Sequence, residues 1–211
     1  IFGDGKRNDL YQTQRAMRAM RKAAIQRGVI AVIDVGSSKV ACLILRFDGP
    51  SNVSSGEVIG SMAGQSSFRV IGASTTKSRG IRFGEIESMA ETERAIRTAL
   101  QAAQKMALVR VDHVIACFSG GAPRSYGVFG EITTENAVVA SHDIGRVLVA
   151  CDLPDFGENR AVLHAHPINF TLDDRSWMSD PRGHIGQKLS VDLHIMTVKE
   201  RTILNLNHCM R

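Results

Sequence analysis

A short polar turn between two apolar runs contains residue types that suit a phosphate group. In VIAVIDVGSSKVACLIL, residues 29–45, the first run ends in an aspartate, and a glycine, two serines and a lysine precede the second. Glycine lets the backbone approach a ligand closely, and the residues after it offer amides, hydroxyls and an ammonium group. The aspartate would suit a magnesium ion held through water. The predicted site residues are Asp34, Gly36, Ser37, Ser38 and Lys39.

The same turn has a purely structural interpretation. Asp34 can cap the turn through an Asx hydrogen bond without any ligand. The turn is not a P-loop, because G-x-x-x-x-G-K is absent, and no G-x-G-x-x-G opens a helix. Local chemistry therefore leaves a phosphate site and an ordinary turn as alternatives.

Apolar periodicity predicts the elements that position this turn. The predicted strands are 29–33, 40–45, 68–74, 111–119, 125–133, 161–170 and 189–198. Ser88 and Glu91 form an S-x-x-E capping box at the start of one helix, Ser141 can cap a second, and a third starts at Lys199. Residues 48–67 are rich in Gly and Ser and predict a loop. This order is typical of an α/β or α+β chain.

The positive charge is concentrated at the N-terminus. The formal net charge is +5, and residues 1–28 contain seven basic and two acidic side chains. The rest of the chain is neutral, with 19 of each sign. Phosphate neutralisation along a nucleic acid needs a basic face, so we expect no nucleic-acid partner for the folded body.

The basic leader, residues 1–27, predicts a helix with a thin apolar stripe. Four cations lie mostly off that stripe: Arg15, Arg18, Arg21 and Lys22. Two interpretations stay open. The leader is either a solvated, partly disordered segment or a contact with an anionic membrane or a partner.

The remaining reactive side chains predict neither a metal site nor a disulfide framework. The four cysteines lie in apolar patterns without a CxxC pair, which predicts buried free thiols. His164 and His166 lack further ligands at suitable spacing, so we expect structural roles for them. No apolar run approaches the ~18 residues of a membrane span. Because the chain starts at Ile1 and stops inside a predicted helix, we expect a piece of a longer protein.

Several segments together resemble one family. IAVIDVGSSKVACLIL is similar to the first phosphate-binding motif of the actin-like ATPases. The later segments resemble the FtsA branch, a family of bacterial cell-division proteins, in the same order along the chain. These segments are VIGASTTKSRGIRFGEIESMAETERAIRTALQAAQKMA, VDHVIACFSGG, RAVLHAHPINFTLDD and DPRGHIGQKLSVDLHIMTV.

The resemblance implies an α/β fold of the actin-like, ribonuclease H-like type. It implies subdomain 1A at residues 28–81 and 161–211, with an inserted α+β subdomain, 1C, at 82–160. The leader has no counterpart in this pattern. We expect the chain to be the first lobe only, without the second phosphate loop, the adenosine pocket and the terminal membrane helix.

The resemblance also implies a function. Members of the family bind ATP with magnesium, polymerise beneath the membrane and link the FtsZ ring to septal wall synthesis. We expect weak or no ATPase activity, and none from this chain alone. FtsZ would bind the absent second lobe, and other division proteins would bind residues 82–160. The expected location is the cytoplasmic face of the bacterial inner membrane, at the division site.

Two alternatives remain within the actin-like superfamily. A related pilus-assembly scaffold would share the loop and the inserted subdomain. A sugar-kinase-type phosphotransferase would need a carboxylate base near a sugar pocket, for which the sequence offers no candidate.

Overall fold

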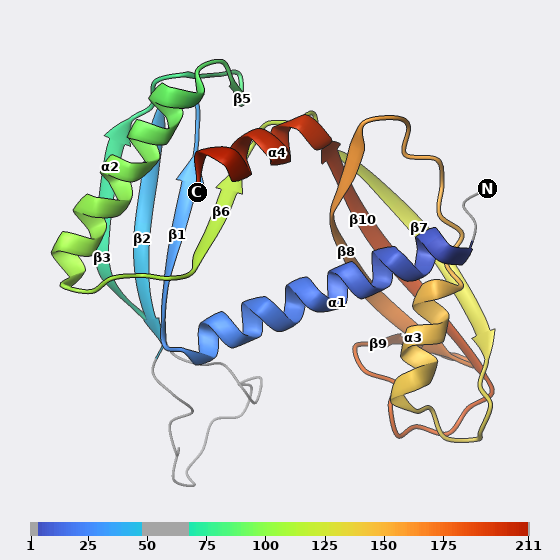
Figure 1. Ribbon diagram of the computed structural model, residues 1–211. Coiled ribbons are helices and arrows are strands. Elements are labelled where there is room, and N and C mark those ends of the chain that lie inside the picture. The colour runs from blue at the N-terminus through green and yellow to red at the C-terminus, as the bar shows by residue number, and fades with distance from the viewer. Residues whose placement is uncertain (1–3, 48–67, 211) are drawn as a thin grey trace, which may run out of the picture. The chain divides into compact units, whose positions relative to one another are not determined.

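Two apolar cores divide the computed structural model into two units, and residues 4–47 and 68–210 are described (Figure 1). Unit A comprises Ala19–Gly121 and Thr202–Arg211, and unit B comprises Ile1–Arg18 and Ala122–Arg201. The loop predicted at 48–67 lies outside the described residues. None of the helices in the described ranges is both long and apolar enough to cross a membrane.

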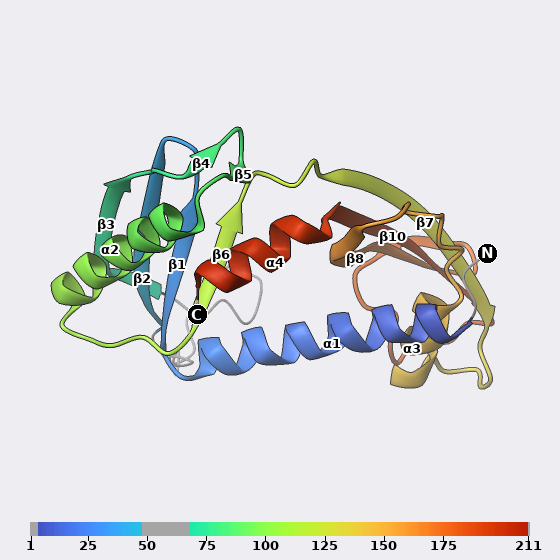
Figure 2. The same cartoon turned by 45° about the horizontal axis from the view of Figure 1, so that its top comes forward.

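Unit A contains a four-stranded sheet in the order β3-β2-β1-β6 (Figure 2). The strands are β1 (Val29–Val35), β2 (Lys39–Phe47), β3 (Phe68–Lys77) and β6 (Val114–Phe118). The first three are antiparallel neighbours, whereas β6 runs parallel to β1. These strands confirm the runs predicted at 29–33, 40–45 and 68–74, and β6 lies within the predicted 111–119.

Helix α2 (Met89–Ala107) covers one face of this sheet. Ser88 is its N-cap, as predicted, because its hydroxyl accepts a hydrogen bond from the Glu91 amide. Small residues let the helix approach closely: a Cβ at Gly72 of β3 would overlap the carbonyl oxygen of Ala103. Helix α4 (Glu200–Cys209) adds Leu206 to the same core.

Unit B contains a second, antiparallel sheet in the order β7-β10-β8-β9. Its strands are β7 (Arg124–Thr133), β8 (Arg160–Leu172), β9 (Arg175–Met178) and β10 (Lys188–Lys199). The alternation predicted for β10 is confirmed from Val191 to Ile195, where the apolar residues are buried and Asp192 is exposed, whereas Ser190, expected on the polar side, is buried. Strand β9 was missed because its polar sequence resembles a loop, and the β8–β9 turn contains Asp173 with a φ of 51°.

Helix α3 (Ser141–Val149) packs on unit B's sheet through Val147. The predicted cap is wrong here. Ala140 is the N-cap, and its amide donates to the carboxylate of Asp143 over 2.9 Å. The buried Asp143 also accepts from Arg146 over 3.0 Å, so a carboxylate one turn into the helix replaces the expected hydroxyl.

The structure corrects the predicted domain boundaries. Residues 82–160 were assigned to the insert, but α2 and β6 belong to unit A, where β6 is hydrogen-bonded to β1. Residues 161–211 were assigned to the actin-like part, but β8 and β10 form the centre of unit B's sheet. The change from unit A to unit B falls at 121/122, and the return falls at 201/202.

Candidate functional site

The predicted phosphate turn closes the β1–β2 hairpin. Val35 pairs with Val40 across the hairpin, and the Gly36 amide donates to the Lys39 carbonyl over 3.1 Å. A Cβ at Gly36 would come within 3.0 Å of that same carbonyl oxygen. The two serines therefore lie at the exposed tip of a tight turn that favours glycine at its start.

Two further segments hold the tip in place. The Ser37 hydroxyl accepts a hydrogen bond from the Gly84 amide over 2.8 Å, and the Ser38 carbonyl accepts from the Ser78 amide over 3.0 Å. Gly84 lies in the turn of a small hairpin formed by β4 (Ile81–Arg82) and β5 (Glu85–Ile86). The tip is thus fixed by side-chain and backbone contacts rather than left loose.

The end of β6 reaches the same place. Because β1 and β6 are parallel and Val35 pairs with Phe118, their carboxyl ends lie at the same sheet edge. A Cβ at Gly120 would overlap the Gly84 carbonyl, and a Cβ at Gly84 would lie 2.7 Å from the Gly120 Cα. Sequence reasoning did not select these two glycines, although the Ser-Gly-Gly directly after a strand was a usable signal.

The positive charge of the site comes from two strands. Lys39 of β2 pairs in register with Lys77 of β3, and both are exposed. Within the described ranges neither lysine has an ion-pair partner, and like charges directly opposite each other repel. An anion between them would remove that repulsion. Lys77 was not predicted.

The backbone at the tip offers unused donors. The amides of Ser37 and Ser38 donate no hydrogen bond to any of the residues that the structure describes. Free amides next to an ammonium group are the donor set that holds phosphate in backbone anion sites.

Asp34 does not cap the turn. Its exposed carboxylate has no hydrogen-bond partner within the described part of the chain, which removes the structural alternative for this residue. In the parallel register Asp34 lies beside Cys117 of β6. The described residues contain no group of three side chains placed to hold a metal ion.

Three of the four predicted cations of the leader lie at described, exposed positions of a helix. Helix α1 (Asp4–Gln26) confirms the predicted helix, with exposed Arg15 and Arg18 in unit B and exposed Lys22 in unit A. Arg18 donates to the Ala165 carbonyl of β8 over 2.8 Å. The side chain of Arg21 lies outside the described residues.

The cysteines are three buried thiols and one exposed thiol. Cys42, Cys151 and Cys209 are buried, and burial raises the pKa of Cys42 to about 11. Cys117 is exposed, which corrects the expectation of four buried thiols. The alternation along β6 explains the error, because Cys117 lies on the face opposite α2.

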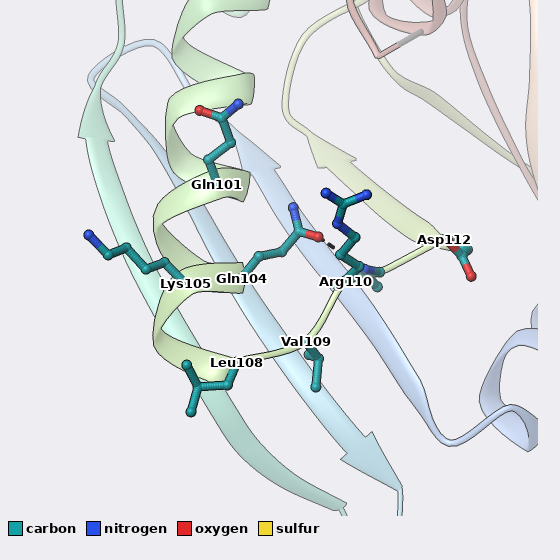
Figure 3. Close-up of a pocket in the computed structure, with 8 residues that line it drawn as sticks. Gln101, Gln104, Lys105, Leu108, Val109, Arg110 and Asp112 are labelled. Atoms are coloured by element: carbon teal, nitrogen blue, oxygen red, sulfur yellow. Dashed lines mark hydrogen bonds between the residues drawn. The ribbon is translucent and has the colours of Figure 1, made fainter.

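A separate pocket of about 640 Å³ lies at the end of α2 (Figure 3). Gln101, Gln104 and Lys105 of the helix and residues 108–112 after it line the pocket. Gln104 accepts a hydrogen bond from the Val111 amide over 3.0 Å, so its side-chain oxygen fixes the following loop. The side-chain oxygen of Gln104 is thus already used within the fold.

Comparison with known proteins identifies the relatives. The SHS2 domain inserted in FtsA matches residues 120–197, close to unit B's main segment, Ala122–Arg201. The cell division protein FtsA of Rhizobium meliloti (strain 1021) is 32% identical over 184 residues, which cover 86% of this chain and 40% of the relative. FtsA of Pseudomonas aeruginosa is 26% identical over 190 residues, covering 90% of this chain and 42% of the relative.

A solved structure supports the fold. A chain of the PilM-PilN type IV pilus biogenesis complex matches with a TM-score of 0.50 at 10% identity, over 86% of this chain and 44% of that chain. The mixed α/β units and these matches confirm the actin-like class with an inserted subdomain. The chain spans about 40% of the length of the first curated relatives it matches. Over most of its length the chain is similar to part of the FtsA cell-division proteins, and the main segment of its unit B matches the SHS2 domain inserted in FtsA.

Proposed function

We propose that this chain supplies one phosphate loop of an ATP site in an actin-like cell-division protein. The observation that carries the proposal is the pair Lys39 and Lys77, two exposed ammonium groups without described ion-pair partners. They lie on adjacent strands, next to the free amides at the tip of the turn. Two segments hold that tip through hydrogen bonds, so the donors are preorganised, which lowers the cost of ordering them on binding.

Each residue of the turn has a proposed role. The Ser37 and Ser38 amides bind phosphate oxygens, Lys39 neutralises their charge, and Gly36 keeps the turn tight. Asp34 binds the magnesium ion of ATP·Mg through water. The turn contains no second carboxylate or histidine that could act as a base toward water, so we expect weak hydrolysis at most.

The partners that we propose are those of a division scaffold. ATP-bound subunits associate into filaments at the cytoplasmic face of the inner membrane, at the division site. FtsZ and the membrane bind parts of the longer protein outside the matched 40%, whereas other division proteins bind unit B. The neutral body fits protein contacts better than contacts with a nucleic acid.

The structural likeness to the chain of the pilus complex favours a second candidate function, that of a pilus-assembly scaffold. Both functions use the same fold, so the test must identify the partner. Co-sedimentation of the longer protein with FtsZ polymers supports the division role. Failure to sediment, together with loss of pili rather than of septa in a deletion strain, would favour the pilus role.

Isothermal calorimetry with ATP·Mg tests the nucleotide site. Only one flank of the nucleotide contacts this chain, and water screens the remaining contacts, so we expect millimolar affinity or weaker by affinity arithmetic. In the longer protein, Lys39→Ala should weaken binding by roughly 10- to 150-fold, because a charge-assisted hydrogen bond contributes about 1.5–3 kcal/mol.

Lys105→Ala is the matched control, since it removes an exposed lysine on α2, away from the turn. We expect it to bind ATP like the parent protein. Micromolar affinity in the 211-residue chain, or unchanged affinity in Lys39→Ala, would show that the turn is not half of a shared site.

A further inference from the structure

A pocket in unit B combines a cationic rim with an apolar floor. Its volume is about 670 Å³, within the roughly 300–1,000 Å³ of small-molecule sites. Its walls come from the middle of α1, from α3, from β8 and from the loop at 179–182.

The rim has more positive than negative charge. Three arginines line the pocket, Arg15, Arg18 and Arg182, against one carboxylate, Asp180. That carboxylate is already occupied, because the Arg182 guanidinium donates to both of its oxygens, at 2.8 and 3.0 Å from Nε. The same hydrogen bonds lower the pKa of Asp180 to about 2, so it stays ionised and paired at neutral pH.

One cation of the rim is free to bind a ligand. Arg18 uses part of its guanidinium on the Ala165 carbonyl, whereas Arg15 has no hydrogen-bond or ion-pair partner among the described residues. A guanidinium carries five donors in a planar fork, which matches the two oxygens of a carboxylate.

The floor of the pocket is apolar. Ile144 and Leu148 of α3 and Pro167 and Phe170 of β8 line it. Phe170 is buried and belongs to the core of unit B, so the floor is part of a packed surface rather than of a mobile tail. An apolar side chain placed there would lose its contact with water.

We propose that this pocket binds a short acidic peptide segment, with a carboxylate on Arg15 and an adjacent apolar side chain against Ile144 and Phe170. The cationic rim gives the charge complementarity, and the floor gives the anchor. A membrane surface fits less well, because these groups line a hollow, whereas interfacial helices bind through an apolar face that projects into the lipid. The inference deepens the proposed partner role of unit B.

Fluorescence anisotropy on the whole 211-residue chain tests the proposal. The probe is a fluorescein-labelled peptide with two adjacent leucines flanked by aspartates, and the comparison peptide has asparagines in place of the aspartates. We expect the acidic peptide to bind more weakly as salt rises, and the asparagine peptide to bind at least tenfold more weakly. Equal affinity for the two peptides would overturn the proposal.

Three variants locate the contact. Arg15→Gln should weaken the acidic peptide about tenfold, as expected for a lost charged hydrogen bond, and Arg15→Lys should recover part of the loss, since it keeps the charge without the fork. Lys22→Gln makes the same charge change on the same helix but at a residue that does not line this pocket, and should bind like the parent. An equal loss in Lys22→Gln would indicate general charge attraction and overturn the site.

Two competitors distinguish the ligand class. Inorganic phosphate at the peptide's concentration should not displace the probe, and phosphatidylglycerol vesicles should bind no better to the parent than to Arg15→Gln. Displacement by phosphate would indicate a simple anion site, and Arg15-dependent vesicle binding without peptide binding would indicate a membrane contact, so either result would overturn the proposal. Nucleotide calorimetry does not enter this test, so the two proposals can fail separately.

Discussion

The shape of the candidate site depends on two glycines, whose lack of a Cβ atom lets their backbones come close together. Gly84 and Gly120 come so close that neither accommodates a Cβ, and this approach places the Gly84 amide on the Ser37 hydroxyl. Gly84 also has a φ of 76°, a conformation that favours glycine. The shape of the turn is therefore set by residues outside the turn itself.

Gly120→Ala should disturb both the fold and the turn. The added methyl overlaps the Gly84 carbonyl, so the β4–β5 hairpin must shift and the Ser37–Gly84 hydrogen bond is lost. Overpacking of this kind costs about 1–3 kcal/mol. Urea denaturation measures the free energy of unfolding, and Gly127→Ala is the control because nothing lies within 4 Å of its Cβ. Equal stabilities of the two variants would contradict the close packing.

At the scale of elements, the sequence predicts which helices and strands form better than it predicts which strands pair. The apolar run 29–33, the Ser88 cap and the alternation at 191–195 each follow from local periodicity, and each is confirmed. The pairing of β6 with β1 depends on contacts between residues about 80 positions apart, which no local pattern encodes. The turn residues were predicted in the same local way, whereas Lys77, Gly84 and Gly120 reach the site only through pairing and packing.

Helix α1 shows how a polar segment gains a structural role. Strand β8 pairs with β10 on one side, while β9 covers only its end, which leaves the other edge open at Ala165. Gln14 accepts a hydrogen bond from the Ala165 amide over 3.2 Å, and Arg18 donates to its carbonyl. One turn of the helix thus satisfies both backbone groups of Ala165 at the open edge of the strand. Sequence reasoning had assigned this helix to solvent, a membrane or a partner.

Gln14→Ala should loosen this contact. Gln14 is buried, and removing its acceptor leaves the buried Ala165 amide unsatisfied, at a cost of about 1–3 kcal/mol. We expect faster hydrogen exchange at the Ala165 amide, measured by NMR. Gln12→Ala, at an exposed position of the same helix, should leave the exchange rate unchanged. Slow exchange retained in Gln14→Ala would mean that the side chain does not protect the edge.

At the scale of the whole molecule, each unit has a core of its own. The core of unit A comes from residues 29–118 together with Leu206 and Cys209, and α2 contributes Ala95, Ile96, Ala99 and Ala103 to it. The core of unit B comes from residues 126–195. A unit whose hydrophobic core is formed entirely by its own residues is expected to fold by itself.

Two deletions decide between the domain boundaries. The first starts the chain at Ala19 and joins Gly121 to Glu200 through a flexible glycine linker, which removes unit B and leaves the core of unit A intact. We expect it to unfold cooperatively in urea.

The second deletion removes residues 82–160, the insert that the sequence suggested, and with it α2 and β6. Unit A then loses the helix that covers its sheet, so the exposed strands should aggregate rather than fold. Introduced into the longer protein, the first deletion should keep ATP binding but abolish binding of the division proteins that we propose for unit B. A folded product from the second deletion and an unfolded one from the first would restore the boundaries at 82 and 160.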